Sequence, residues 1–175
     1  MQGPIYRFLA DDHDRLDGLF RKAATDRDNI DMNAYAAFRS GLLHHIRMEE
    51  TVLLPAALRL QGGRPLAIAE RIRLDHGALT ALMVPPPDGS VLNTLRSILE
   101  VHNALEEQEG GMYHVCEQLA GEEAEVLLRQ LKEVPEVPLH SHNPKPEILE
   151  ATRRAVERAG YSMKPAESPA DSRQG

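Results

Sequence analysis

The feature that most constrains the fold is an internal repeat of helical sequence. At a shift of 57 residues, the segment that starts at Arg39 lies over the one that starts at Arg96, and both read R-S-x-L-x-x-H-x-x-x-E-E. At a shift of 63 residues, Asp12-His13 lies over Asp75-His76, each pair followed by leucines three and six residues after the histidine. The chain therefore resembles two copies of one helical hairpin.

Apolar residues recur at helical spacing along most of the chain, and no segment alternates as a strand does. Helices are predicted at about 4–24, 32–60, 65–83 and 90–119, then at about 122–134 and 147–160. Asp31 is a good N-cap for the second helix. Pro55 predicts a kink inside that helix, and Gly110-Gly111 predicts a bulge or an early end in the fourth.

These elements predict an all-α fold, namely an antiparallel up-down-up-down four-helix bundle with additional C-terminal helical segments and a disordered tail. The bundle is expected to span residues 1–120. Residues 121–163 are expected to form C-terminal helices and a Pro-rich linker that pack on the bundle or extend from it. The tail, residues 164–175, is rich in Pro, Ser, Ala and charge and is expected to be disordered.

Composition excludes some classes of partner and compartment. The formal net charge of −7 argues against nucleic acid and anionic membranes, both of which need a basic surface. No apolar run approaches the length of a membrane span, and the first twelve residues lack the pattern of a signal peptide. The single cysteine, Cys116, rules out an intrachain disulfide and fits a reducing compartment. A cytoplasmic protein is therefore expected.

The repeat also places metal-ligating side chains together. Residues four apart lie on one face of a helix, so His45 and Glu49 project together, as do His102 and Glu106. Each copy adds a single histidine from its first helix, and titratable groups in a bundle core are costly unless paired or bound to metal. The predicted metal ligands are His13, His45, Glu49, His76, His102 and Glu106. Imidazole and carboxylate donors suit iron, manganese or zinc.

Two hairpins related by a pseudo-twofold axis would place the two sets of donors face to face. We expect Glu49 and Glu106 to bridge two metal ions, because a carboxylate has an oxygen for each of them. His13 and His45 would then bind one ion, and His76 and His102 the other.

The run His45-Ile-Arg-Met-Glu49-Glu50-Thr-Val-Leu-Leu-Pro55 resembles the HHE motif of the hemerythrin-like cation-binding proteins, and the resemblance covers about residues 3–120. It implies a four-helix bundle with two iron ions, oxo- or hydroxo-bridged, which bind or react with dioxygen. Manganese or zinc are alternatives. The implied small ligands are dioxygen, peroxide or nitric oxide, and family members carry oxygen, sense oxygen or iron, store iron or respond to stress.

Two departures bear on function, one from the helix end that the family usually shows and one from its oxygen carriers. Their fifth histidine ligand, one turn before that of the third helix, is replaced here by Ile72. The helix end after Glu106 also differs, since Gly110-Gly111-Met112 stands where the first copy has Leu53-Leu54-Pro55. Four histidines leave open positions on both irons, which favours redox turnover or sensing over reversible carriage.

Several other titratable residues are assigned plainer roles. His44 and His114 are expected not to be ligands, Asp17 is a minority candidate, and Tyr113 is expected to pack in the core. Glu50 and Glu107 are expected to face solvent in ion pairs, with contact to a ligand histidine as the lesser alternative. His140 and His142 read as part of a polar linker.

The sequence favours a non-haem di-iron protein for oxygen, redox or iron sensing, storage or detoxification. One alternative is a di-iron oxidase or peroxidase, for which the sequence names neither a substrate nor an electron donor, so it leaves open whether the protein is an enzyme. Another is a metal-stabilised helical module that forms a homodimer or binds a protein partner through the arm after Val134.

Overall fold

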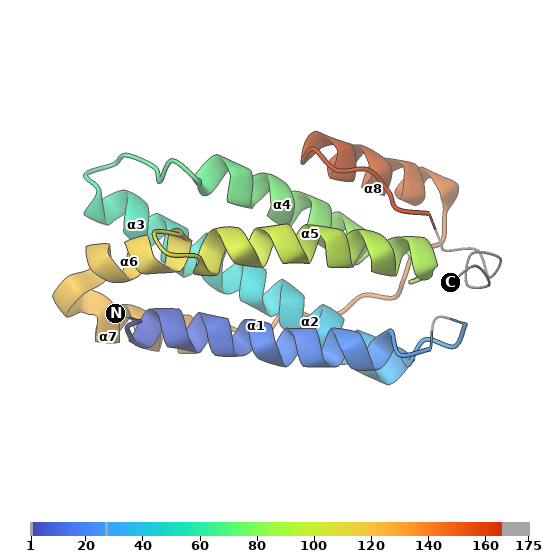
Figure 1. Cartoon of the computed structure of the whole chain (residues 1–175), viewed down its shortest axis with the longest axis horizontal. Helices are drawn as coiled ribbons and strands as arrows, with labels where there is room; N and C mark the ends of the chain where they lie inside the picture. Colours follow the sequence, from blue (N-terminus) through green and yellow to red (C-terminus); the bar gives the residue numbers. More distant parts are fainter. Residues whose placement is uncertain (1, 27, 166–175) are drawn as a thin grey trace, which may run out of the picture.

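The structure, a computed structural model, describes residues 2–26 and 28–165, and the regular structure in this part of the chain is all helical. Four helices lie side by side along the long axis, and successive ones run in opposite directions (Figure 1). They are α1 (Pro4–Ala23), α2 (Met32–Met48), α4 (Ala69–Leu82) and α5 (Gly89–Glu107). The all-α prediction is confirmed. No helix among the described residues is long and apolar enough to cross a membrane.

The helices begin where capping side chains or proline favour it. Pro4 occupies the first turn of α1, where its missing N–H costs nothing. The Asp31 carboxylate accepts hydrogen bonds from the backbone N–H groups of Asn33 and Ala34, which confirms it as the N-cap of α2. Asp88 caps α5 in the same way, through the N–H of Val91 at 2.8 Å.

The proline of the first copy is accommodated by a wider turn of helix. A π-helical segment, η1 (Glu49–Leu53), joins α2 to α3 (Leu54–Leu60). The N–H of Leu54 donates to the carbonyl of Glu49, five residues back, and Pro55 follows at the start of α3. Such π turns occur frequently at functional sites, and this one begins at a predicted ligand.

In the second copy the helix is interrupted, whereas in the first it continues through the wider π turn. The fourth helix was expected to reach about residue 119, but α5 ends at Glu107 and a separate helix, α6 (Met112–Ala120), follows. Gly110 has a positive φ of 76°. A Cβ on Gly111 would lie 2.7 Å from the carbonyl oxygen of Leu105 and 2.8 Å from that of Glu106. The early end predicted at Gly110-Gly111 is therefore confirmed, and it lets the chain turn tightly back over the end of α5.

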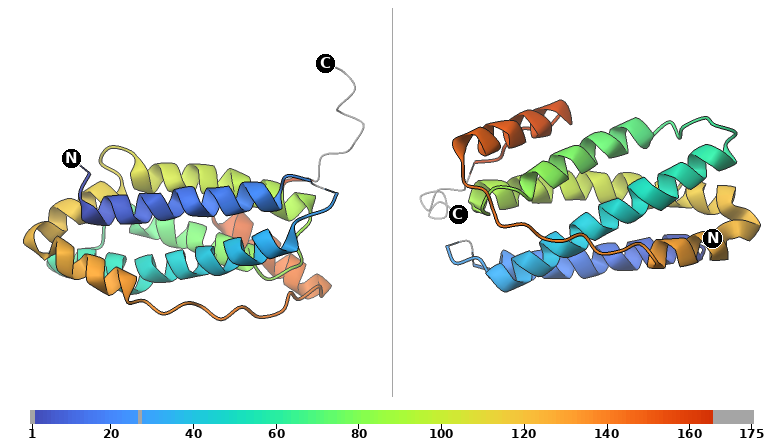
Figure 2. Two further views of the ribbon diagram at one scale, coloured as in Figure 1. Left: turned by 90° about the horizontal axis from the view of Figure 1, so that it is seen from below. Right: turned by 180° about the vertical axis from the view of Figure 1, so that it is seen from behind.

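The C-terminal elements lie against the bundle (Figure 2). A short 3-10 turn, η2 (Gly121–Glu123), leads into α7 (Ala124–Lys132), which packs on α1, and α8 (Pro146–Arg158) packs on α4. Between them the extended linker is held by Arg39, whose guanidinium donates to the carbonyl of His140 at 2.9 Å. The tail expected to be disordered lies, from residue 166 on, outside the described residues.

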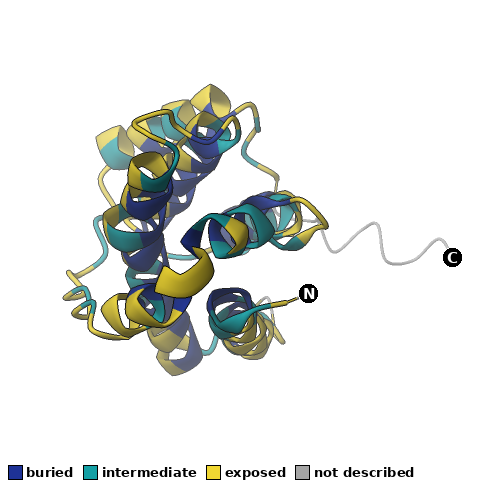
Figure 3. Cartoon of the chain, turned by 90° about the vertical axis from the view of Figure 1, so that its left-hand side faces the viewer, coloured by how far each residue is buried: buried dark blue, intermediate teal, exposed yellow. Residues whose placement is uncertain are grey.

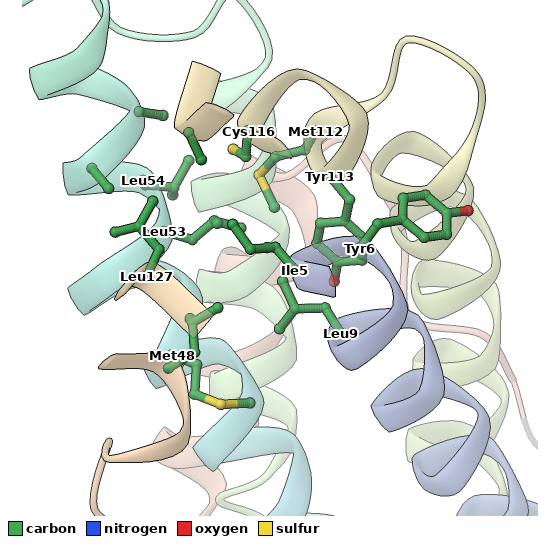
Figure 4. Packing of buried hydrophobic residues seen from close by; sticks show 14 of the residues in the cluster. Ile5, Tyr6, Leu9, Met48, Leu53, Leu54, Met112, Tyr113, Cys116 and Leu127 are labelled. Carbon is green, nitrogen blue, oxygen red and sulfur yellow. The ribbon is translucent and has the colours of Figure 1, made fainter. Parts of the chain in front are cut away.

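The apolar core is divided in two by a polar layer. The buried residues lie along the inner faces of the helices (Figure 3), and the apolar ones form two clusters. The first includes Ile5, Leu9, Met48 and Tyr113 (Figure 4), and the second includes Phe20, Phe38, Leu79 and Leu95. On each of the four long helices a predicted ligand histidine lies between residues of the two clusters. The layer of histidines is thus shielded by apolar packing above and below.

Candidate metal centre

The structure brings the six predicted ligand side chains together in this layer. They form two groups whose donor atoms lie within 4.8 Å of one another. One group is His13, His45, Glu49 and Glu106, and the other is Glu49, His76, His102 and Glu106. All six are buried, and both glutamates are 0% exposed. The pairing of histidines expected from the repeat is the one found in space.

Each glutamate faces both pairs of histidines, one oxygen to each. Glu49 places Oε1 3.3 Å from His45 Nε2 and Oε2 3.0 Å from His76 Nε2. Glu106 places Oε2 3.3 Å from His13 Nε2 and Oε1 3.2 Å from His102 Nε2. In this arrangement each carboxylate would offer one oxygen to each of two neighbouring cations.

Several of these atoms lack an ordinary hydrogen-bond partner. Glu49 Oε2, Glu106 Oε1 and His76 Nε2 are buried without a well-oriented hydrogen bond among the described residues, although Glu49 Oε2 and His76 Nε2 lie 3.0 Å apart. Buried polar atoms are nearly always satisfied, and an unpaired buried charge costs several kcal/mol. Cations placed between the histidines and carboxylates would satisfy all three atoms, so the donor set fits metal ions. Its mixture of nitrogen and oxygen suits iron, manganese or zinc.

Outside this set, four further carboxylates face the Nδ1 atoms of the histidines, and three of them lie at hydrogen-bonding distance. The aspartate before each first-helix histidine reaches the second-helix histidine of its own copy. Asp12 Oδ2 lies 2.8 Å from His45 Nδ1, and Asp75 Oδ2 lies 3.5 Å from His102 Nδ1. A carboxylate on Nδ1 fixes the ring so that Nε2 points at the metal position.

The second glutamate of each Glu-Glu pair crosses to the other copy. Glu107 Oε1 lies 2.5 Å from His13 Nδ1, and Glu50 Oε1 lies 2.7 Å from His76 Nδ1. The expectation that these glutamates serve mainly as solvent-facing ion pairs was wrong, although Glu50 also pairs with Arg73 at 3.2 Å. Their repetition beside each ligand glutamate was the signal in the sequence that could have identified this role.

The remaining titratable candidates stay out of the centre. His44 Nε2 contacts the carbonyl of Val134 at 2.8 Å, and His114 Nδ1 that of Gln108 at 3.0 Å. Asp17 pairs with Arg21 on the surface of α1. Tyr113, by contrast, does more than pack in the core, because its hydroxyl enters the group of His13 and His45.

A cavity of about 490 Å³ opens onto the centre from the side of the second cluster. It lies between α1, α2 and α5, and three candidate ligands, His13, His45 and His102, line its inner end. Its walls are mostly apolar and include Leu16, Phe20, Phe38, Leu42, Ile46 and Leu99. The exposed residues Asp17, Arg21 and Glu100 surround its mouth. A small molecule therefore has a route from solvent to the histidines.

Comparison with known families agrees with this geometry. The model of the hemerythrin HHE cation-binding domain matches residues 5–111. The chain belongs to this family. No curated protein and no solved structure matched the chain in the corresponding searches. Family membership and the buried histidine and glutamate groups together identify a metal-binding protein.

The protonation states of the metal-free centre follow from its carboxylates. Burial lowers the pKa of His45, but Glu49 and Asp12 outweigh it and raise that pKa to about 10. Burial likewise opposes a raised pKa at His76, which Glu49 and Glu50 bring to about 9. The same imidazoles overcome burial at Glu49 and hold its pKa well below the usual range. Without metal, protons on the imidazoles therefore balance the buried carboxylates.

The stability of the metal-free protein is expected to fall as pH rises. The pKa of His45 is raised from 6.5 to about 10 and that of His76 to about 9, so their contribution is full below pH 6.5 and lost by pH 10. We expect the free energy of unfolding to drop by more than ~1 kcal/mol across this window. Urea denaturation at several pH values measures it. The metal-loaded protein, in which cations replace the protons, should show no such slope, and a flat metal-free profile would contradict the assignment.

Removing the charge of an outer carboxylate should weaken metal binding without removing a ligand. Glu107→Gln leaves His13 in place but removes the charge beside its Nδ1, and we expect metal affinity to fall by ~10-fold or more. Competition with a chelator measures the affinity. Glu109→Gln, an exposed position two residues on, is the matched control and should bind as the unmodified protein does. Equal affinities for both variants would show that Glu107 has no such role.

Proposed function

We propose that the protein binds two iron ions, without haem, and that this centre binds or reacts with dioxygen or peroxide. The observation that carries the proposal is the position of Glu49 and Glu106 between the two histidine pairs. Each glutamate presents one carboxylate oxygen to each pair. His13 and His45 would hold one ion, and His76 and His102 the other. The role would be sensing, storage or detoxification involving oxygen, peroxide, nitric oxide or iron.

Iron in the ferrous state would supply electrons to dioxygen or peroxide. The chain's own contribution is to position the donors and to control access. The outer carboxylates orient the imidazoles, the first apolar cluster closes one side of the layer, and the second leaves, within the described residues, only the cavity as a route to solvent. Position 72, where oxygen carriers have a further histidine, is a fully buried isoleucine and adds no donor. Open coordination positions therefore remain for a small ligand.

The cavity gives such a ligand its route. Its walls are apolar, which suits dioxygen and nitric oxide, and its inner end is formed by three of the candidate ligands. The charged residues Asp17, Arg21 and Glu100 are exposed, and the half-buried Arg96, whose guanidinium lies over the ring of Phe20, also lines the cavity. Because most of the wall is apolar, small uncharged molecules should enter more readily than ions.

A second candidate function is a di-iron oxidase or peroxidase. The volume of about 490 Å³ favours it, because the cavity exceeds the needs of dioxygen and falls within the range of organic-ligand sites. Steady-state consumption of peroxide with a reducing dye distinguishes this enzyme from a binding protein. A single turnover per iron pair would favour the binding protein.

The direct experiment is metal analysis with absorption spectra of anaerobically purified protein, before and after exposure to air. We expect two irons per chain and ferric charge-transfer bands that appear only after air. Refolding with zinc should give a colourless protein that does not respond to air. A single metal per chain, or zinc alone in protein taken from cells, would contradict the di-iron proposal.

Blocking the cavity should slow the reaction without emptying the centre. Leu99 is half-buried and lines the cavity, so Leu99→Trp places a larger ring in the route. We expect the oxidation rate of the ferrous protein, measured by stopped flow, to fall several-fold with two irons still bound. Leu19→Trp is the matched control, because Leu19 is also half-buried on the second cluster but lies away from the cavity. Equal rates for the two variants would exclude this route.

A further inference from the structure

Tyr113 places its hydroxyl at the centre of the first ligand group. The oxygen lies 3.0 Å from His13 Nε2 and 3.1 Å from His45 Nε2. It also lies 2.7 Å from Glu49 Oε1 and 3.1 Å from Glu106 Oε2. These are the four atoms that this group would turn toward a metal ion, and the tyrosine is 0% exposed.

Without metal, protonated imidazoles can donate hydrogen bonds within this cluster, but a histidine must be neutral to bind a metal ion, and neutral histidines leave the cluster short of donors. Glu107 and Asp12 accept hydrogen bonds at the Nδ1 atoms of His13 and His45, which leaves lone pairs on both Nε2 atoms. Two carboxylate oxygens add two more acceptors. One phenol O–H can donate to only one of the four, whereas a cation attracts all of them and the phenol oxygen as well.

The local backbone places the tyrosine there. Gly110 and Gly111 turn the chain back over the end of α5, so α6 starts with Tyr113 in its first turn. The ring packs among the first apolar cluster, and its hydroxyl points in a different direction from that of Tyr6 (Figure 4). The ring cannot swing out to solvent without breaking this packing.

We propose that Tyr113 is a seventh protein ligand, coordinating through its phenol oxygen the metal ion held by His13 and His45. This inference rests on the proposed metal centre. As the metal–oxygen bond forms, the phenol proton is released to solvent, as with other ligands that must be deprotonated. A phenolate is a hard anionic donor that suits ferric iron.

The ligand makes the two metal positions unequal. At the shift of 57 residues, Tyr113 corresponds to Ala56, which has no donor atom. The ion between His76 and His102 therefore has four protein donors, and its neighbour has five. The family match ends at residue 111, so the tyrosine lies outside the matched segment. It also approaches from the first apolar cluster, on the opposite side of the ligand layer from the cavity.

The experiment uses the full chain loaded with ferric iron, in unmodified form and as Tyr113→Phe and Tyr6→Phe. Tyr6 is the matched control, because it is a buried neighbour whose hydroxyl donates to the carbonyl of Glu107, outside the donor set. Metal analysis gives the iron content of each protein. Absorption and resonance Raman spectra report a phenolate bound to ferric iron, through its visible charge-transfer band and its ring vibrations.

We expect two irons in all three proteins, with the phenolate band and vibrations present in the unmodified protein and in Tyr6→Phe but absent from Tyr113→Phe. If Tyr113→Phe does not fold, ring-deuterated tyrosine in the other two proteins must shift the vibrations. Two bound irons without a phenolate signal, or a signal that survives Tyr113→Phe, overturns the inference and leaves the metal centre standing. Failure of the unmodified protein to bind two irons overturns the metal centre itself.

Discussion

Two buried carboxylates at the middle of the helical bundle require positive charge beside them, and the rest of the centre is arranged to provide it. Glu49 and Glu106 are fully buried, and neither faces a lysine or an arginine within the described residues. Such charges are tolerated only next to positive charge. The four imidazoles provide it in either of two ways, by carrying protons when metal is absent or by holding cations together with the glutamates. The same pocket of negative charge thus accounts for the raised pKa of His45 and for the fit to metal.

The outer carboxylates follow from this requirement and tie the bundle together. Each aspartate links the two helices of its own hairpin, while each outer glutamate links one hairpin to the other. Asp12 and Asp75 therefore act within the copies, and Glu50 and Glu107 act between them. Metal binding and hairpin docking rest on the same contacts, so a loss of ligand geometry is also a loss of packing at the middle of the bundle.

Much of this was predictable because it depends on helix periodicity alone. A spacing of four residues fixes His45 and Glu49 on one face whatever the neighbouring helices do. The duplication then implied a second such pair and a symmetric partner for His13. The contact of Glu107 with His13 was ranked only as the lesser alternative, because it depends on which face α5 turns to α1. That orientation is a property of packing, and the sequence pattern of one helix does not contain it.

The geometry of the helix ends also could not be predicted from the sequence. A glycine pair predicts a break, but the direction in which α6 leaves is set by close contact of Gly111 with the carbonyls of Leu105 and Glu106. In the first copy the corresponding stretch stays helical through a π turn, in which the N–H of Leu54 bonds to the carbonyl of Glu49 and Pro55 lies in the first turn of α3. The two copies thus end this helix differently, and only the second places a tyrosine, Tyr113, at the centre, where the sequence of the first copy has Ala56.

Because the two copies end differently, the two sides of the ligand layer are not equivalent, as the repeat alone would make them. On one side the first apolar cluster closes the centre and contributes a hydroxyl, and on the other the cavity leaves it open to small molecules. A symmetric pair of hairpins would offer two equivalent positions to an incoming ligand. One donor group has an additional oxygen nearby, from Tyr113, and both groups share Glu49 and Glu106. The duplicated hairpin therefore supplies the pair of sites, and the broken helix after α5 makes them different.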